Sequence, residues 1–369
     1  MSATPPDRWH VVHVDPEMGY SGGEVQVFLL IDGLVERGHR VTVVAQPGSP
    51  VEAAARDRGL AVWSVPMRGD WDLAAVSRLT RALRHARPDV VHLHTGRANW
   101  LGGWAASKAS VLAVSTRRMD RTVKRNWKNR RVYGSWIART AAISPAVLAQ
   151  LHAGGVPHER TELIWSVVDP FALHPKTPRS AVRSELGAGA EDFVVLAAGA
   201  LVERKGFDGL IRAWQAVPAP CRLWIAGEGP LRGSLEQRVG ELGLQARVQL
   251  LGRRQDMADL LAASDAFAMP SHAEGLGIAA LEAMAAGLPV VGARVGGLAD
   301  LVVPDSTGLL LDPGDVPAWS AALIRLAQDP ALAHSWGQAG QERVHRQFLP
   351  EQMVGAYERF YRTAWLAST

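Results

Sequence analysis

Cysteine is almost missing from this chain of 369 residues, which contains a single one, Cys221. One thiol excludes an internal disulfide and a thiolate cage for zinc, and so excludes a secreted disulfide scaffold. Long apolar runs are missing as well, because the longest unbroken ones, residues 193–202 and 283–293, are about half of what a bilayer span requires. The polar start, residues 1–8, has no apolar signal segment. We therefore expect a cytoplasmic protein without a membrane span.

The chain also lacks a strong overall charge, since its formal net charge is +4. This value conceals a basic segment, residues 117–131, in which eight basic residues and one acid give +7 and leave −3 for the rest of the chain. The charge is too modest and too local for a dedicated nucleic-acid binder. It indicates an anionic partner, either lipid at the inner face of the plasma membrane or a phosphate-bearing acceptor, with Trp127 and Trp136 as amphipathic neighbours. A solvated loop without a partner is the alternative.

Short β-rich runs alternate with segments of helical period, the pattern of parallel sheets covered by helices on both faces. Three prolines interrupt the alternation in residues 168–179, so we expect two doubly wound α/β domains, residues 1–172 and 173–347. A last segment, residues 348–369, carries aromatic side chains at helical spacing and needs a surface to cover. The expected strands are residues 10–14, 40–45, 61–65, 89–94, 111–115 and 140–143 in the first domain and 193–198, 222–226, 248–250, 266–269, 289–292 and 308–311 in the second.

One constellation of acids and glycines stands out in the second domain. Glu274 follows an expected strand, Glu282 lies eight residues later in an expected helix, and Gly275, Leu276 and Gly277 lie between them. Glycines there allow a ligand to approach the backbone, and the free N–H groups at a helix start favour an anion or a hydroxyl-rich group. The two carboxylates would contact different parts of one elongated ligand. The alternative is a glycine-rich turn with two surface acids.

Two further turns of the second domain also follow expected strands. Arg204 and Lys205 precede a helix, which is the arrangement of an anion site. A position of Arg204 in solvent is the alternative. Gly227 and Gly229 form a second turn, which on its own indicates no more than a strand-to-helix connection.

In the first domain, Gly22 and Gly23 lie between the first strand and the first helix, where phosphate-binding turns occur. With Gly19 they do not have the spacing of a dinucleotide fingerprint, so a hydride-transfer enzyme loses support. His92 and His94 end a strand and lie on the same side of it, which makes a metal site conceivable. We expect no metal there, because the sequence offers no third ligand nearby.

These motifs resemble those of the family 4 retaining glycosyltransferases, above all in the E-x7-E element of Glu274 and Glu282. The resemblance implies the GT-B fold, in which two Rossmann-like domains face a central cleft and a C-terminal helix packs back on the first domain. It implies that Glu274 contacts hydroxyls of a donor sugar, that Glu282 holds the ribose of a nucleotide, and that His94 lies beside the sugar-transfer centre. The chain departs from the family at Ala200, where an arginine is usual, and Arg204 is the candidate replacement.

The activity implied by this resemblance is that of a hexosyltransferase. It would move the sugar of a nucleotide-diphosphate sugar to a glycan or lipid-linked acceptor with retention of configuration, in the assembly of cell-envelope polysaccharide or lipopolysaccharide. We expect no metal and no other cofactor, because no D-x-D motif is present. A nucleotide-sugar epimerase of the same architecture and a polyanion-binding protein that uses residues 117–131 are the alternatives. The expected catalytic residues are His94, Lys205 and Glu274; the expected donor-binding residues are Gly22, Gly23, Arg204, Lys205, Gly227, Gly229, Glu274, Gly275, Leu276, Gly277 and Glu282; the expected acceptor or membrane residues are Arg117, Arg118, Arg121, Lys124, Arg125 and Trp127.

Overall fold

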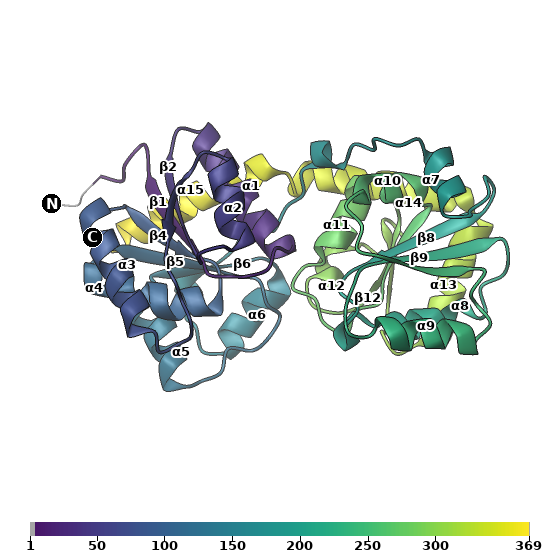
Figure 1. Ribbon diagram of the computed structural model, residues 1–369, viewed down its shortest axis with the longest axis horizontal. Coiled ribbons are helices and arrows are strands. Elements are labelled where there is room, and N and C mark those ends of the chain that lie inside the picture. Colours follow the sequence, from purple (N-terminus) through teal and green to yellow (C-terminus); the bar gives the residue numbers. More distant parts are fainter. Residues whose placement is uncertain (1–3, 369) are drawn as a thin grey trace. The chain divides into compact units, whose positions relative to one another are not determined.

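The computed structural model describes residues 4–368, which form two compact units (Figure 1). Unit 1 contains the chain up to Ser166 together with the segment from Pro350 onward, and unit 2 is Val167–Leu349. The first division lies before the predicted one at residue 172, because the short 3-10 helix η4 (Pro170–Leu173) contacts helix α11 (Ile278–Ala285) of unit 2.

A seven-stranded parallel sheet forms the centre of unit 1. Its strand order is β3-β2-β1-β4-β5-β6-β7. Strands β2 and β3 are added on one side of β1 and strands β4 to β7 on the other, as in a Rossmann fold. The strands are β1 (His10–Asp15), β2 (Arg40–Ala45), β3 (Ala61–Ser64), β4 (Val90–Leu93), β5 (Leu112–Arg117), β6 (Arg139–Ala142) and β7 (Thr161–Leu163). The helices are α1 (Gly22–Glu36), α2 (Pro50–Asp57), α3 (Leu73–Ala86), α4 (Gly103–Ala109), α5 (Trp127–Arg131), α6 (Pro145–Ala153), α15 (Pro350–Leu366), the π-helices η1 (Ala98–Gly102) and η2 (Val132–Trp136), and the 3-10 helix η3 (His158–Arg160).

The central strands of unit 1 are hydrophobic because both of their faces are covered. Every residue of β1 and β4 is buried, which explains their near-continuous valine runs. Ligands of such sheets bind at the carboxyl ends of the strands where the order reverses, which here are the ends of β1 and β4. Strand β7 was not predicted from the sequence, because this three-residue edge strand has only one hydrophobic side chain.

Unit 2 is built on a second parallel sheet, with the six-stranded order β10-β9-β8-β11-β12-β13. Figure 1 shows helices on both sides of it, with α10 and α9 on opposite sides of β8 and β9. Its core includes the fully buried rings of Trp214 and Trp319. The strands are β8 (Phe193–Ala198), β9 (Cys221–Ala226), β10 (Val248–Gly252), β11 (Ala266–Met269), β12 (Val290–Ala293) and β13 (Gly308–Leu311). The helices are η4, α7 (Arg179–Glu185), η5 (Glu203–Lys205), α8 (Phe207–Trp214), α9 (Arg232–Glu241), α10 (Met257–Ala263), α11, α12 (Leu298–Leu301), α13 (Val316–Gln328) and α14 (Pro330–Gln347).

The C-terminal helix α15 belongs to unit 1, although α14 before it belongs to unit 2. It packs against α1 and β5, and its Glu358 binds Arg37 at 2.7 Å and His39 at 2.8 Å. The prediction of a C-terminal helix that packs back on the first domain is thereby confirmed, as are the two parallel α/β domains. In the described part of the chain, no helix combines the length and the apolar character needed to cross a bilayer.

Candidate active site

Lys205 and Glu274 form a buried ion pair in unit 2, with Nζ 2.5 Å from Oε1. Lys205 ends η5, which follows β8, and Glu274 lies in the loop after β11. Because β8 and β11 are parallel neighbours, their carboxyl ends bring the two loops together. The side chains are 11% and 9% exposed, so little water screens the attraction between them.

The backbone holds these two loops against each other. The N–H of His272 donates to the carbonyl oxygen of Arg204 at 2.7 Å. Gly206 has a φ of 69°, and a Cβ at this position would come within 2.1 Å of the carbonyl oxygen of Pro270. Only glycine fits this contact, so Gly206 permits the close approach that pairs Lys205 with Glu274.

Arg204 lies at the edge of the Lys205–Glu274 pair. Its Nη1 is 3.8 Å from Oε1 of Glu274, and its side chain is 51% exposed. One buried ammonium and one half-exposed guanidinium thus share a single carboxylate. The resulting excess of positive charge suits an anionic ligand.

Glu282 differs from Glu274 because nothing in residues 4–368 pairs with its carboxyl group. It lies inside α11, which starts after Gly277. Burial raises the pKa of Glu282 to about 7. At neutral pH the group is therefore partly protonated, and it can both donate and accept hydrogen bonds.

The other residues predicted to bind a donor are chiefly backbone positions. Gly275 and Leu276 lie between β11 and α11, and the Leu276 side chain is buried, so only its backbone is available to a ligand. Gly227 and Gly229 follow β9, and a Cβ at Gly227 would come within 1.9 Å of the carbonyl oxygen of Gly199. Packing between two loops therefore accounts for Gly227 without a ligand.

In unit 1, three buried histidines lie together at the carboxyl ends of β1 and β4. His13 is paired with His92 across the two strands, and His94 follows two residues later. The His13 and His94 rings are stacked 5.1 Å apart, and the His92 and His94 rings are 4.2 Å apart. The expectation that no third histidine lies near His92 and His94 is wrong, because the parallel register aligns His13 with them.

The hydrogen bonds of this histidine cluster fix its tautomers. Arg118 contacts Nδ1 of His94 at 3.3 Å, and a guanidinium can only donate, so Nδ1 accepts. His94 therefore carries its proton on Nε2 and donates to Nδ1 of His13 at 2.8 Å. Burial lowers the pKa of His13 to about 3 and that of His94 well below its usual value, and His92 and Arg118 lower the latter further. Both rings are neutral, and Nε2–H of His13 has no acceptor in the described part of the chain.

His92 is held by hydroxyl groups from the C-terminal helix and from β5. Its Nδ1 lies 2.8 Å from the hydroxyl of Tyr361, and its Nε2 lies 2.7 Å from Oγ1 of Thr116. The Tyr357 hydroxyl binds Thr116 in turn at 2.7 Å. The aromatic stripe of α15 thus supports the histidine cluster as well as the core.

A metal ion fits this cluster poorly, although one nitrogen from each ring lies within 4.8 Å of the others. Both nitrogens of His92 already have hydroxyl partners, and Nδ1 of His94 faces a guanidinium. A fixed positive charge beside the rings would repel a cation.

Arg118 also connects the cluster to the start of α1. A Cβ at Gly23 would lie 3.9 Å from Cδ of Arg118, and helix α1 begins at Gly22 with a capping box between Ser21 and Glu24. The guanidinium and the helix start therefore lie close together, with the Glu24 carboxylate and the Ser21 hydroxyl capping part of the first turn. The structure places Gly23 and His94 beside Arg118, and Gly22 precedes Gly23 at the start of α1.

Asp15 belongs to the same region and was not predicted from the sequence. It ends β1 and is 1% exposed. Burial raises its pKa to about 7, Glu24 adds to that rise, and a backbone hydrogen bond from Glu17 and the charge of Arg118 oppose it. An acid at the end of the first strand, just before a glycine-rich turn, is the sequence signal that could have identified it.

The predicted acceptor or membrane residues do not form one cluster. Arg118 is the member that contacts the histidines, whereas Arg117 donates to the carbonyl oxygen of Arg121. The remaining members lie around helix α5 and are Lys124, Arg125 and Trp127.

Two family models match the chain. The model described as Glycosyltransferase Family 4 matches residues 20–170, and the model described as Glycosyl transferases group 1 matches residues 178–343. The first therefore lies almost wholly in unit 1 and the second in unit 2.

Characterised proteins and solved structures are similar over nearly the whole chain. A lipopolysaccharide core biosynthesis glycosyltransferase, LpsD of Rhizobium meliloti, is 30% identical over 94% of this chain and 96% of its own length. A D-inositol 3-phosphate glycosyltransferase of Xylanimonas cellulosilytica is 30% identical over 95% and 93%. The structure of Anabaena HepE in complex with UDP and glucose matches with a TM-score of 0.85 at 22% identity, over 96% of this chain and 99% of HepE.

Proposed function

This chain belongs to the family 4 glycosyltransferases, and we propose that it transfers a hexose from a nucleotide-diphosphate sugar to a glycan or lipid-linked acceptor with retention of configuration. The arrangement of the E-x7-E element carries this proposal. Glu274 is held by Lys205, and Glu282, eight residues later in the sequence, is unpaired in the described residues. The lipopolysaccharide role of LpsD and the UDP and glucose bound by HepE support a place in cell-envelope glycan assembly and a UDP-sugar donor.

The donor would be held by unit 2. Glu282 would bind the ribose hydroxyls, since a partly protonated, unpaired carboxyl group can match two hydroxyls. Glu274 would accept hydrogen bonds from hydroxyls of the sugar. Lys205 and Arg204 would face the diphosphate, whose leaving charge needs cations or helix N-termini to stabilise it.

Transfer with retention would proceed on one face of the sugar. The bond from the anomeric carbon to the diphosphate oxygen breaks, a bond to the acceptor oxygen forms on the same side, and the acceptor proton passes to the departing phosphate. Glu274 would position the sugar in this step and not attack it, because its Oε1 is committed to Lys205. Lys205 and Arg204 can supply the charge needed by the departing group, so we propose that no metal is required.

His94 would contact the sugar through Nδ1. That atom is a hydrogen-bond acceptor held by a long contact of 3.3 Å with Arg118, which a sugar hydroxyl could replace. A neutral ring suits this role, since a protonated imidazole could only donate.

The test is mass-spectrometric detection of nucleoside diphosphate released from UDP-, GDP- and ADP-sugars, with UDP-glucose as the first donor. Each donor is incubated with chelator and with pooled glycan and lipid-linked acceptors. We expect release from one donor only when acceptor is present, which also separates transfer from epimerisation. A product with inverted anomeric configuration, or activity that chelator abolishes and magnesium restores, would contradict retention or metal independence respectively.

A further inference from the structure

Five tryptophans of unit 1 gather in one cluster, which we call the tryptophan patch. Trp100 lies at its centre, with ring centroids 5.5 Å from Trp127, 5.0 Å from Trp136 and 6.0 Å from Trp71. Trp104 stacks on Trp136 at 6.0 Å. Trp71 and Trp127 lie 6.2 Å apart and are 63% and 57% exposed, so the patch presents two large rings to its surroundings.

The exposed rings are held in place by polar contacts. Nζ of Lys128 lies 4.7 Å from the ring of Trp71 and 5.1 Å from that of Trp100, and it binds Asp70 at 3.1 Å. The Trp100 indole N–H donates to the Asp70 carbonyl oxygen at 2.6 Å. Cation–π contacts and hydrogen bonds thus order an apolar surface that packing alone would not keep exposed.

Helix α5 contributes residues both to this patch and to a basic cavity. The cavity has a volume of about 590 Å³ and is lined by Lys124, Arg125, Arg130 and Tyr133, with the chain around residues 154–157 as its other wall. Within residues 4–368, none of its three cations forms an ion pair. Trp127 and Lys128 of the same helix belong to the patch.

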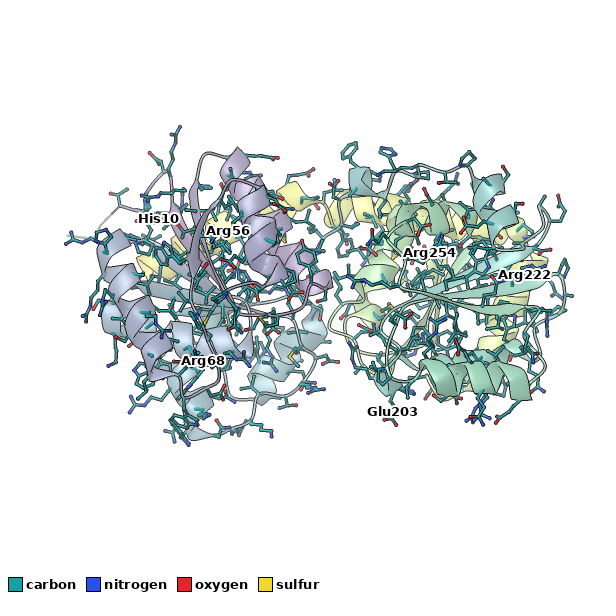
Figure 2. The ribbon with its side chains drawn as sticks, in the orientation of Figure 1. His10, Arg56, Arg68, Glu203, Arg222 and Arg254 are labelled. Carbon is teal, nitrogen blue, oxygen red and sulfur yellow. The ribbon has the colours of Figure 1, made fainter. Side chains whose placement is uncertain are left out.

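Most Lys and Arg side chains of unit 2 form ion pairs with neighbouring acids. Arg222 and Arg254, both labelled in Figure 2, bind Asp192 and Asp256, and Arg183 binds Asp265 at 2.6 Å. The three cations of the basic cavity have no acid partner in the described residues, so their charges are available to an anion from outside the chain.

We propose that the tryptophan patch and the basic cavity together bind the surface of an anionic lipid bilayer. Lipid phosphates would enter the cavity, and Trp71 and Trp127 would lie in the interface, where amphipathic rings are stable. Leu73, 61% exposed and two residues from Trp71, extends the apolar side. A bilayer is favoured over a glycan because Lys128 and Asp70, the polar groups at the rings, are already paired with each other. Binding to a bilayer would bring the protein close to a lipid-linked acceptor, and this part of the inference rests on the proposed function.

Flotation of the full chain with vesicles tests this proposal. One set contains phosphatidylcholine alone and the other equal amounts of phosphatidylcholine and phosphatidylglycerol. We expect binding to the anionic vesicles, a steep loss of binding with salt, and little binding to the neutral ones. Lys124→Ser with Arg130→Ser should weaken binding about 25-fold, at about fivefold for each charge. Trp71→Ser with Trp127→Ser should weaken it by about tenfold or more for each ring.

Matched controls come from unit 2. Phe171→Ser removes an exposed ring, and Arg212→Ser with Arg253→Ser removes two exposed charges, so neither should change vesicle binding. Equal binding to neutral and anionic vesicles, or wild-type binding by either unit 1 double variant, would overturn the proposal. Wild-type vesicle binding together with lost binding of a soluble glycan acceptor in the tryptophan variant would assign the patch to a glycan instead.

The vesicle assay is independent of the proposed function, because it needs neither donor nor acceptor. Donor turnover with a soluble acceptor is measured on the same preparations as a separate readout. Vesicle binding without any turnover would overturn the proposed function alone. Turnover without vesicle binding would overturn the bilayer proposal alone.

Discussion

The candidate sites of the two units differ in charge: the one in unit 2 contains a buried ion pair, and the one in unit 1 contains buried neutral histidines. In unit 2, Lys205 and Glu274 are both charged and compensate each other at 2.5 Å. In unit 1, the buried histidines are neutral, and Arg118 is the one charged group that contacts them in the described residues. The first arrangement suits a ligand with a negative charge and hydroxyls. The second is a network of neutral histidines and hydroxyl groups in which Arg118 fixes the tautomers of His94 and His13.

Removal of Lys205 should have the largest effect in this comparison. Lys205→Ala takes away a cation that we propose faces the departing diphosphate, and it leaves a buried Glu274 without its partner, so kcat/KM should fall about a thousandfold. Initial rates of nucleoside diphosphate release measure this. Arg204→Ala, which removes a half-exposed cation, should cost about tenfold. If the Arg204 variant lost more activity than the Lys205 variant, the diphosphate role would belong to Arg204.

Asp15 of unit 1 and Glu282 of unit 2 should both make the free energy of unfolding depend on pH, because burial raises the pKa of each to about 7. As the pH rises from about 4 to 7, the unfolded chain loses the Asp15 proton before the folded chain does, so the free energy of unfolding falls. The Asp15→Asn protein lacks this pH dependence. Its free energy of unfolding should therefore gain about 3 kcal/mol on that of the wild type between pH 5 and pH 8, which is less than the full pKa shift of Asp15 allows. Glu282→Gln should act in the same direction but less, since the pKa of Glu282 rises to about 7 from a higher ordinary value than that of Asp15.

Urea unfolding of the wild type and of both variants at pH 5 and pH 8 measures these differences. Parallel pH dependence in the wild type and the Asp15→Asn protein would show that Asp15 is ionised throughout, and that Arg118 outweighs burial.

Arg118 tests whether the neutral network of unit 1 depends on its single cation. Arg118→Ala removes the donor that makes Nδ1 of His94 an acceptor, so the tautomers of His94 and His13 should no longer be fixed. We expect kcat/KM to fall about 30-fold, as for loss of one positioning hydrogen bond to a charged group. Ring ¹⁵N shifts of selectively labelled histidines report the tautomers. Arg117→Ala is the control, and an unchanged His94 spectrum in the Arg118 variant would refute this assignment.

The fold could be predicted from the sequence because its signals are local. Hydrophobic strand runs and helical periods located all the strands but β7, and strands such as β8 and β11 have the predicted bounds. Helix α14 (Pro330–Gln347) was not predicted, since its buried stripe includes Gly337 and Gly340 and gives only a weak hydrophobic signal. The E-x7-E element and Lys205 were likewise visible, because the residues of each motif are close in sequence.

The histidine cluster could not be predicted in the same way. His13 and His94 are 81 residues apart, and only the register of β1 against β4 brings them together. The hydroxyl of Tyr361 reaches His92 across 269 residues, from a helix whose period indicated packing alone. A single sequence contains no information about register, so such contacts require the structure.

The smallest expected effect is that of Tyr361, whose contact with His92 should affect stability and not activity. Tyr361→Phe removes the hydroxyl that binds Nδ1 of His92 and should cost about 1 kcal/mol of unfolding free energy, since a buried nitrogen loses its partner. Tyr20→Phe is the matched control: its hydroxyl makes no hydrogen bond in residues 4–368, and its ring is 40% exposed. Transfer activity should stay near the wild-type level in both variants, because His92 acts on the cluster through packing and Arg118 still fixes His94. A Tyr361→Phe protein of normal stability but reduced activity would contradict this prediction. It would show that the Tyr361 hydroxyl of α15 takes part in transfer.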